Sequence, residues 1–189
     1  PSGSGKSTLI FEVLAKRKAN ISGLEQFDKI VEINQLPLTK MKRSNVATYS
    51  EVYSEMRNVF AKTKLAKSEK YLQLGQSLTT LSGGECQRLK LAKELIMHQD
   101  SQRYLYLMDE PTIGLHPKDI EHFLKLLDHF IEQGHSVIVV EHNQQVIRHS
   151  DWVIDLGPEG GDNGGQIIFE GTPFDLQNSH SITAKYLTK

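Results

Sequence analysis

The sequence predicts an α/β fold in which a largely parallel sheet is flanked by helices. Short apolar runs of strand type alternate with helical patterns, a glycine-rich loop with a lysine opens the chain, and an acidic pair ends one of the apolar runs. With 189 residues, of which 38% are hydrophobic, the chain can bury one ordinary core. We therefore expect a single domain over residues 1–189.

Composition excludes several classes of protein. The formal net charge of −1 neither favours nor excludes a nucleic-acid partner. The single cysteine, Cys86, excludes a disulfide framework and a cysteine-clustered zinc site within this chain, so no zinc is expected. No long apolar run or signal peptide is present. These features predict a soluble cytoplasmic protein with no membrane contact.

The first eight residues match the phosphate-binding loop G-x-x-x-x-G-K-[ST], here called the P-loop, except that its first glycine would precede Pro1. Gly3 and Gly5 let backbone N–H groups curl around phosphate, Lys6 can reach the β and γ oxygens, and Ser7 offers a hydroxyl to magnesium. A helical pattern follows at once, which a flexible linker would not explain. The residues expected to bind ATP here are Ser2, Gly3, Ser4, Gly5, Lys6, Ser7 and Thr8. Because the chain starts inside the loop, we expect it to be a fragment of a longer one.

Residues 29–33 predict a short buried strand, and Gln35 follows its end, where its amide oxygen can complete a magnesium shell. A loop at 37–45 and a helix at 49–60 are expected next. Between residues 40 and 70 basic side chains outnumber acids, a bias that can face DNA phosphates but is more often a solvated face.

Residues 81–89 read Leu-Ser-Gly-Gly-Glu-Cys-Gln-Arg-Leu. Ser82 and Glu85 have the spacing of a capping box, so a helix should begin here with its N–H groups left bare by Gly83 and Gly84. Such an N-terminus can receive phosphate oxygens, although an ordinary capped helix is the alternative for this stretch by itself. We expect a helical region at 45–98 that carries this signature.

The apolar run at residues 104–108 ends in Asp109 and Glu110. It predicts a buried strand that delivers two carboxylates at its C-terminal end. Adjacent residues of a strand point in opposite directions, so different roles are expected. Asp109 can hold magnesium, while Glu110 can orient or deprotonate the water that attacks the γ-phosphate. Two solvated acids are the alternative, which the preceding P-loop disfavours.

The remaining chain predicts scaffold elements and one further site residue. An amphipathic helix is expected at 117–133, with six inward side chains at helical spacing: Ile120, Phe123, Leu124, Leu127, Phe130 and Ile131. A fully buried strand is expected at 137–140, and further strands at 152–156 and 166–170. The glycine-rich turn at 157–165 lacks a lysine and a following helix, so it predicts only a hairpin connection.

A short helix should begin at 172–173. His142, at a strand end, is a candidate γ-phosphate contact, although a histidine there by itself would more often be structural.

The order of these features resembles the nucleotide-binding domain of the ABC ATPase superfamily: P-loop, Gln35, the Leu-Ser-Gly-Gly-Glu signature, Asp109-Glu110 and His142. The stretches at 79–85, 109–116, 141–143 and 151–161 resemble the C-terminal ATPase half of the UvrA family, over nearly the whole chain. The loop at 113–116 differs from that of transporter ATPases. The resemblance implies a P-loop NTPase fold of the ABC ATPase type with a reduced helical signature region.

The resemblance also implies a function, namely ATP-dependent recognition of DNA damage in nucleotide excision repair. ATP would lie between the P-loop of one ATPase half and the signature of the other. Magnesium would be held by Ser7, Gln35 and Asp109, and Glu110 and His142 would be catalytic. The signature residues facing the opposite ATP would be Ser82, Gly83, Gly84, Glu85 and Gln87. The implied partners are the other ATPase half, a second copy of the parent protein, the excinuclease component UvrB and double-stranded DNA.

The sequence departs from the family at one place. Residues 63–77 stand where the family carries a cysteine-rich zinc module. We expect weak or absent ATPase activity from the isolated chain, because a composite site needs two halves. Three alternatives stay open: the ATPase component of an ABC transporter, a UvrA-like paralogue that confers antibiotic resistance, and an inactive fragment.

Overall fold

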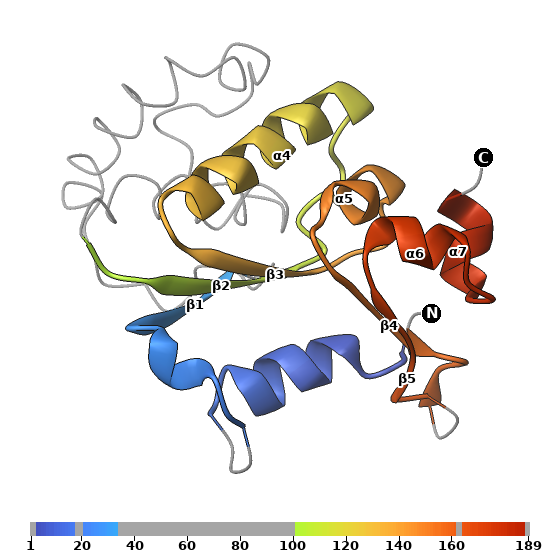
Figure 1. Cartoon of the computed structure of the whole chain (residues 1–189), viewed down its shortest axis with the longest axis horizontal. Coiled ribbons are helices and arrows are strands. Elements are labelled where there is room, and N and C mark those ends of the chain that lie inside the picture. Colours follow the sequence, from blue (N-terminus) through green and yellow to red (C-terminus); the bar gives the residue numbers. More distant parts are fainter. Residues whose placement is uncertain (1–2, 18–20, 34–100, 162–163, 188–189) are drawn as a thin grey trace, which may run out of the picture.

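The computed structural model describes residues 3–17, 21–33, 101–161 and 164–187 (Figure 1). The expected loop at 37–45, the helix at 49–60 and the signature region at 45–98 lie outside these residues. In chain order the elements are η1 (Thr8–Leu14), η2 (Leu24–Gln26), β1 (Lys29–Ile33), β2 (Tyr104–Asp109), α4 (Pro117–Glu132), β3 (Ser136–Val140), α5 (Gln144–His149), β4 (Val153–Gly157), β5 (Gln166–Gly171), α6 (Pro173–Gln177) and α7 (Ile182–Leu187).

Strands β1, β2 and β3 form one sheet in that order, and both pairings are parallel. Ile30 lies opposite Leu105, and Leu107 lies opposite Ile138. The carboxyl ends of the three strands therefore share one edge of the sheet. This arrangement confirms the predicted parallel sheet.

The central strand β2 is covered on both faces, as Figure 1 shows with η1 on one side of the sheet and α4 on the other. Tyr106 and Met108 pack in the cluster that contains α4. Leu105 and Leu107 pack in the cluster that contains Ile10 of η1. Because side chains alternate along a strand, a continuous apolar run serves both clusters.

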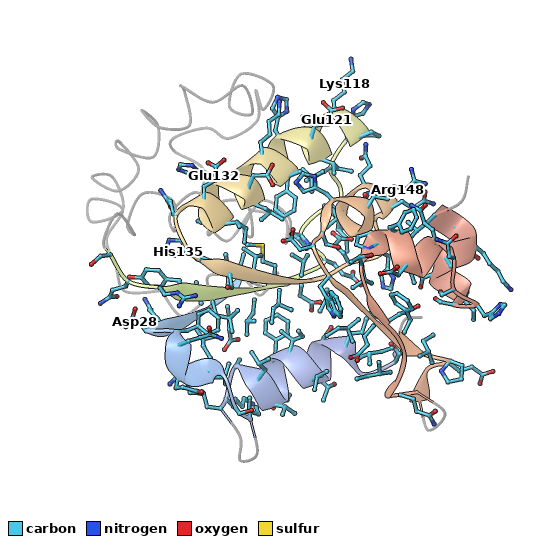
Figure 2. All side chains as sticks on the ribbon, in the orientation of Figure 1. Asp28, Lys118, Glu121, Glu132, His135 and Arg148 are labelled. Atoms are coloured by element: carbon cyan, nitrogen blue, oxygen red, sulfur yellow. The ribbon has the colours of Figure 1, made fainter. Side chains whose placement is uncertain are left out.

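Helix α4 begins after His116, whose ring nitrogen accepts the N–H of Lys118 at 3.3 Å. Four of the six predicted inward side chains are buried, namely Ile120, Phe123, Leu127 and Phe130, and Leu124 is partly buried. The prediction is wrong for Ile131, which is 45% exposed. It follows Phe130 by one residue, so it is rotated away from the sheet. Lys118 and Glu121 extend from the outer side of α4 (Figure 2).

Two further expectations need correction. The helix after the P-loop is present, but it is a π-helix in which Ala15 N–H donates to Ile10 O at 2.9 Å. Strand β3 is buried only at Val140 and half-buried at its other positions, although full burial was predicted. Among the described strands β3 is paired along one edge only, by β2, which leaves it less covered than the central strand.

Strands β4 and β5 form a separate antiparallel pair, which confirms the predicted hairpin. Thr172 caps α6 by accepting the N–H of Asp175 at 3.2 Å, as the predicted helix start requires. Helix α5 was not predicted. Asn143 caps it by accepting the N–H of Gln145 at 2.9 Å. None of the helices within the described ranges is long and apolar enough to cross a membrane.

The double coverage of β2 leads to a prediction about stability. Leu107 is fully buried, so Leu107→Ala should lower the free energy of unfolding by about 3 kcal/mol through lost burial and the cavity left behind. Urea denaturation measures this change. Ile131→Ala, at a position that is 45% exposed, is the matched control and should lower it by less than about 1 kcal/mol. Equal losses would show that β2 is not the buried centre.

Candidate functional site

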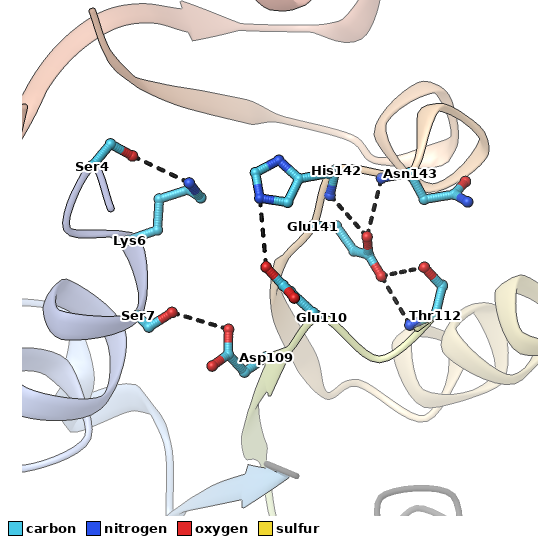
Figure 3. Close-up of polar contacts among 9 residues, drawn as sticks. All are labelled: Ser4, Lys6, Ser7, Asp109, Glu110, Thr112, Glu141, His142 and Asn143. Atoms are coloured by element: carbon cyan, nitrogen blue, oxygen red, sulfur yellow. Dashed lines mark hydrogen bonds and ion pairs between the residues drawn. The ribbon is translucent and has the colours of Figure 1, made fainter. Parts of the chain in front are cut away.

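The described part of the P-loop turns through two glycines and then enters η1. Gly3 has a φ of 76° and Gly5 a φ of 86°, values that side chains with a Cβ rarely adopt. Ser4 between them is 1% exposed. Lys6 Nζ donates to Ser4 Oγ at 3.1 Å (Figure 3). The ammonium group of Lys6 therefore lies against the turn formed by Gly3, Ser4 and Gly5.

Ser7 joins the P-loop to the carboxyl end of β2. Its Oγ donates a hydrogen bond to Oδ1 of Asp109 at 3.1 Å, across 102 positions of sequence (Figure 3). A hydroxyl and a carboxylate are oxygen ligands of the kind that magnesium prefers. The structure therefore brings together two of the three residues expected to hold magnesium, while Gln35 lies outside the described residues.

Glu110 follows directly but no longer belongs to the strand. Strand β2 ends at Asp109, and Glu110 has a φ of 44°, in the left-handed region. Its N–H donates to Val140 O at 2.8 Å, at the end of β3. The expectation that both acids belong to the strand and are separated by its alternation is therefore wrong for Glu110, because the backbone turns directly after Asp109.

Glu110 meets His142, which follows the end of β3. Oε1 of Glu110 lies 3.5 Å from Nε2 of His142 (Figure 3). The side chains are 36% and 50% exposed, so both can be reached from solvent. The two residues predicted to be catalytic therefore lie together, one after β2 and the other after β3.

Glu141 was given no role from the sequence, yet its carboxylate organises this edge. One oxygen accepts from Thr112 N–H at 2.9 Å and from the Thr112 hydroxyl. The other accepts from His142 N–H at 2.8 Å and Asn143 N–H at 3.0 Å. Glu141 thus ties the segment after β2 to the segment after β3 (Figure 3). The sequence feature that could have indicated a role for Glu141 is its position at the end of an apolar run, next to His142.

A cavity of about 1310 Å³ opens beside these residues. Lys6, Glu141, His142 and Glu159 form part of its lining. Much of the remaining lining is apolar and comes from β3, β4, α5 and α7. The polar end of the cavity coincides with the P-loop and the carboxyl edge of the sheet, where ligands of open α/β sheets bind.

The structure describes most, but not all, of the predicted site. Gly3, Ser4, Gly5, Lys6 and Ser7 form the loop, and Thr8 begins η1. Asp109 ends β2, Glu110 follows it, and His142 lies just beyond the end of β3. The predicted residues outside the described ranges are Ser2, Gln35, Ser82, Gly83, Gly84, Glu85 and Gln87. Within those ranges no three His, Cys, Asp or Glu side chains form a metal-binding group. The donors present suit magnesium, which protein sites commonly bind through one or two carboxylates, substrate phosphates and water.

Comparison with known proteins shows what the chain is similar to. Residues 1–113 match the family model described as ABC transporter. The UvrABC system protein A of Aquifex aeolicus is 33% identical over an alignment of 297 residues that covers 100% of this chain and 32% of the relative. Because that alignment is longer than the 189-residue chain, it includes positions of the relative with no counterpart here.

Solved structures agree with this likeness. UvrA2 from Deinococcus radiodurans superposes with a TM-score of 0.76 at 30% identity, covering 99% of this chain and 36% of that one. cbiO1 from Clostridium perfringens, part of the ABC transporter complex cbiONQ, gives 0.54 at 18% identity, covering 100% of this chain and 81% of that one. The second match shows the fold alone. The chain spans about a third of the length of the curated relatives it matches.

The role of Glu141 yields a prediction. Glu141→Gln replaces an acceptor oxygen by an amide group that cannot accept the N–H donors it faces. The free energy of unfolding should fall by about 1–2 kcal/mol, because these N–H donors lose a charged acceptor. Thermal and urea unfolding measure it. Glu132→Gln, at a side chain that is 77% exposed and 3.9 Å from His129, is the control. A Glu141→Gln effect no larger than the control would contradict the tying role.

Proposed function

Because the chain belongs to the ABC transporter family, we propose that it binds ATP with magnesium through the P-loop. The observation that carries this proposal is the contact between Ser7 Oγ and Asp109 Oδ1 at 3.1 Å. It puts a hydroxyl and a carboxylate where the N–H groups of the loop and the Lys6 ammonium can hold phosphates. Gln35 adds an amide oxygen to the metal shell in this proposal.

The same edge supports hydrolysis. Glu110 orients the attacking water and accepts its proton, and His142 contacts the γ-phosphate. Their separation of 3.5 Å lets one water lie against both side chains. Glu141 holds the backbone of His142 through the bond at 2.8 Å, so it positions the histidine without touching ATP.

We propose that the site is completed by a second ATPase half. The signature residues Ser82, Gly83 and Gly84, with Glu85 and Gln87, serve the ATP bound to the opposite half. ATP bridging two halves favours their closure, and hydrolysis releases it. The isolated chain then hydrolyses ATP weakly, because it holds one half of each composite site.

The cellular role that the comparisons favour is that of UvrA, as the C-terminal ATPase half of a UvrA-like protein. Identity of 33% to UvrABC system protein A extends along the whole chain. ATP binding and hydrolysis would gate the binding of double-stranded DNA and the loading of the excinuclease component UvrB, in a homodimeric cytoplasmic parent protein. The transporter alternative has support from the family model, which is described as ABC transporter, and from a fold match at 18% identity. An antibiotic-resistance paralogue would keep the same ATPase residues.

Substitutions in the loop and at the strand end separate binding from hydrolysis. Lys6→Ala should abolish ATP binding, because the loop loses its side-chain contact with the β and γ phosphates. Glu110→Gln should retain binding and lower the hydrolysis rate at least about a hundredfold, as loss of a general base does. Calorimetry and phosphate release measure the two effects. Lys118→Ala, exposed on α4, is the control and should change neither. ATP binding that survives Lys6→Ala would contradict the assignment.

The repair role has a separate test in the complete parent protein. Binding to lesion-bearing and undamaged duplexes is measured with ATP, for the unaltered protein and for Glu110→Gln. A preference for the lesion that changes with the substitution is expected, since hydrolysis would gate DNA binding. Equal affinity for both duplexes with intact ATPase activity would instead support the transporter or antibiotic-resistance role.

A further inference from the structure

The glycine-rich turn between β4 and β5 touches the P-loop. We call its described residues, 158–161 and 164–165, the glycine turn. Gly161 N–H donates to Gly3 O at 3.2 Å, and Gly165 N–H donates to Ser4 O at 3.1 Å. Figure 1 shows the β4–β5 hairpin beside the N-terminal end of the described chain. The sequence predicted only a hairpin connection here, and the contact with the P-loop was missed.

These two hydrogen bonds fix the direction of peptide groups in the P-loop. In a trans peptide the C=O and the following N–H point in opposite directions. The carbonyls of Gly3 and Ser4 point to the glycine turn, so the N–H groups of Ser4 and Gly5 point away from it. A loop that binds phosphate with its N–H groups needs partners for the carbonyls that face outward. The glycine turn supplies two such partners.

We propose that the glycine turn is a positioning element for phosphate binding, which orients the N–H groups of Ser4 and Gly5 toward the β and γ phosphates. This inference rests on the proposed function of the P-loop. It assigns to residues 158–161 and 164–165 a part in nucleotide affinity, although they lie more than 140 positions from the P-loop in sequence.

The packing between the two segments requires glycine. A Cβ at Gly164 would lie 2.8 Å from Glu159 O, 3.1 Å from Gly161 O and 3.2 Å from Ser4 Cα. All three neighbours are backbone atoms, which cannot rotate out of the way as a side chain can. A methyl group at position 164 must therefore distort the glycine turn at Glu159 and press against the backbone of Ser4 in the P-loop.

A displacement at Ser4 reaches the lysine of the loop. Ser4 is 1% exposed, so a shift of its backbone changes its packing against the surrounding atoms. Its hydroxyl accepts the hydrogen bond from Lys6 Nζ at 3.1 Å. Separation of the glycine turn from Ser4 would thus disturb both the N–H groups and the ammonium group. Affinity for the phosphates should fall, whereas contacts with the adenosine part should be unaffected.

The test is the substitution Gly164→Ala in the full chain. The dissociation constants for ATP and for inorganic tripolyphosphate are measured by calorimetry, and both are expected to rise about tenfold, the equivalent of one or two hydrogen bonds to a charged ligand. Gly165→Ala is the second variant. Its Cβ has open space, but its φ of 77° strains the peptide that donates to Ser4, so a smaller rise in both constants is expected.

Gly134→Ala is the matched control for backbone strain. Its φ is 87°, no atom lies within 4 Å of its added Cβ, and it follows α4 rather than facing the P-loop. It should shift the unfolding midpoint without changing either dissociation constant. If Lys6→Ala abolishes ATP binding while Gly164→Ala and Gly165→Ala bind like the unaltered chain, the inference is overturned and the proposed function stands. Absence of ATP binding by the unaltered chain would overturn both.

Discussion

Burial of β2 on both faces is the constraint on which the candidate site depends. The strand carries five consecutive buried residues, and its next residue, Asp109, is half-buried at the sheet edge. Because η1 packs on one face of the strand, the end of the P-loop lies at the same edge of the sheet. There the Ser7 hydroxyl donates a hydrogen bond to the Asp109 carboxylate. Packing of an apolar run thus determines where two polar groups meet. The parallel pairing with β3 then brings His142 beside Glu110.

Much of this arrangement could be predicted from the residues. Alternation of apolar runs with helical patterns predicts a parallel sheet, and a parallel sheet collects the ends of its strands at one edge. Asp109, Glu110 and His142 each follow such a run, so their proximity follows from topology. The P-loop was recognised from Gly3, Gly5 and Lys6, because glycines at this spacing let backbone N–H groups surround a phosphate and the lysine can reach its oxygens. What each residue does with ATP stays a prediction.

Other features depend on tertiary contacts that no local pattern encodes. The left-handed φ of Glu110 is accompanied by a hydrogen bond to Val140 on a neighbouring strand. The half-burial of β3 depends on which strands flank it, whereas its apolar composition suggests full burial. Glu141 is one acid among many in the sequence, and two of its four donor groups belong to Thr112, which lies 29 positions away and is brought to it by folding. The other two are the N–H groups of the adjacent His142 and Asn143. The contact of the glycine turn with the P-loop joins segments at opposite ends of the chain.

We propose that Ser7 and Asp109 together hold a divalent ion with ATP. The most direct measurement is electron paramagnetic resonance of Mn²⁺ in place of Mg²⁺, titrated with the chain in the presence and absence of ATP. We expect a protein-bound Mn²⁺ signal that requires ATP and is weakened by Ser7→Ala and by Asp109→Asn, but not by Glu121→Gln on the outer side of α4. An ATP-dependent signal unchanged in both site variants would contradict it.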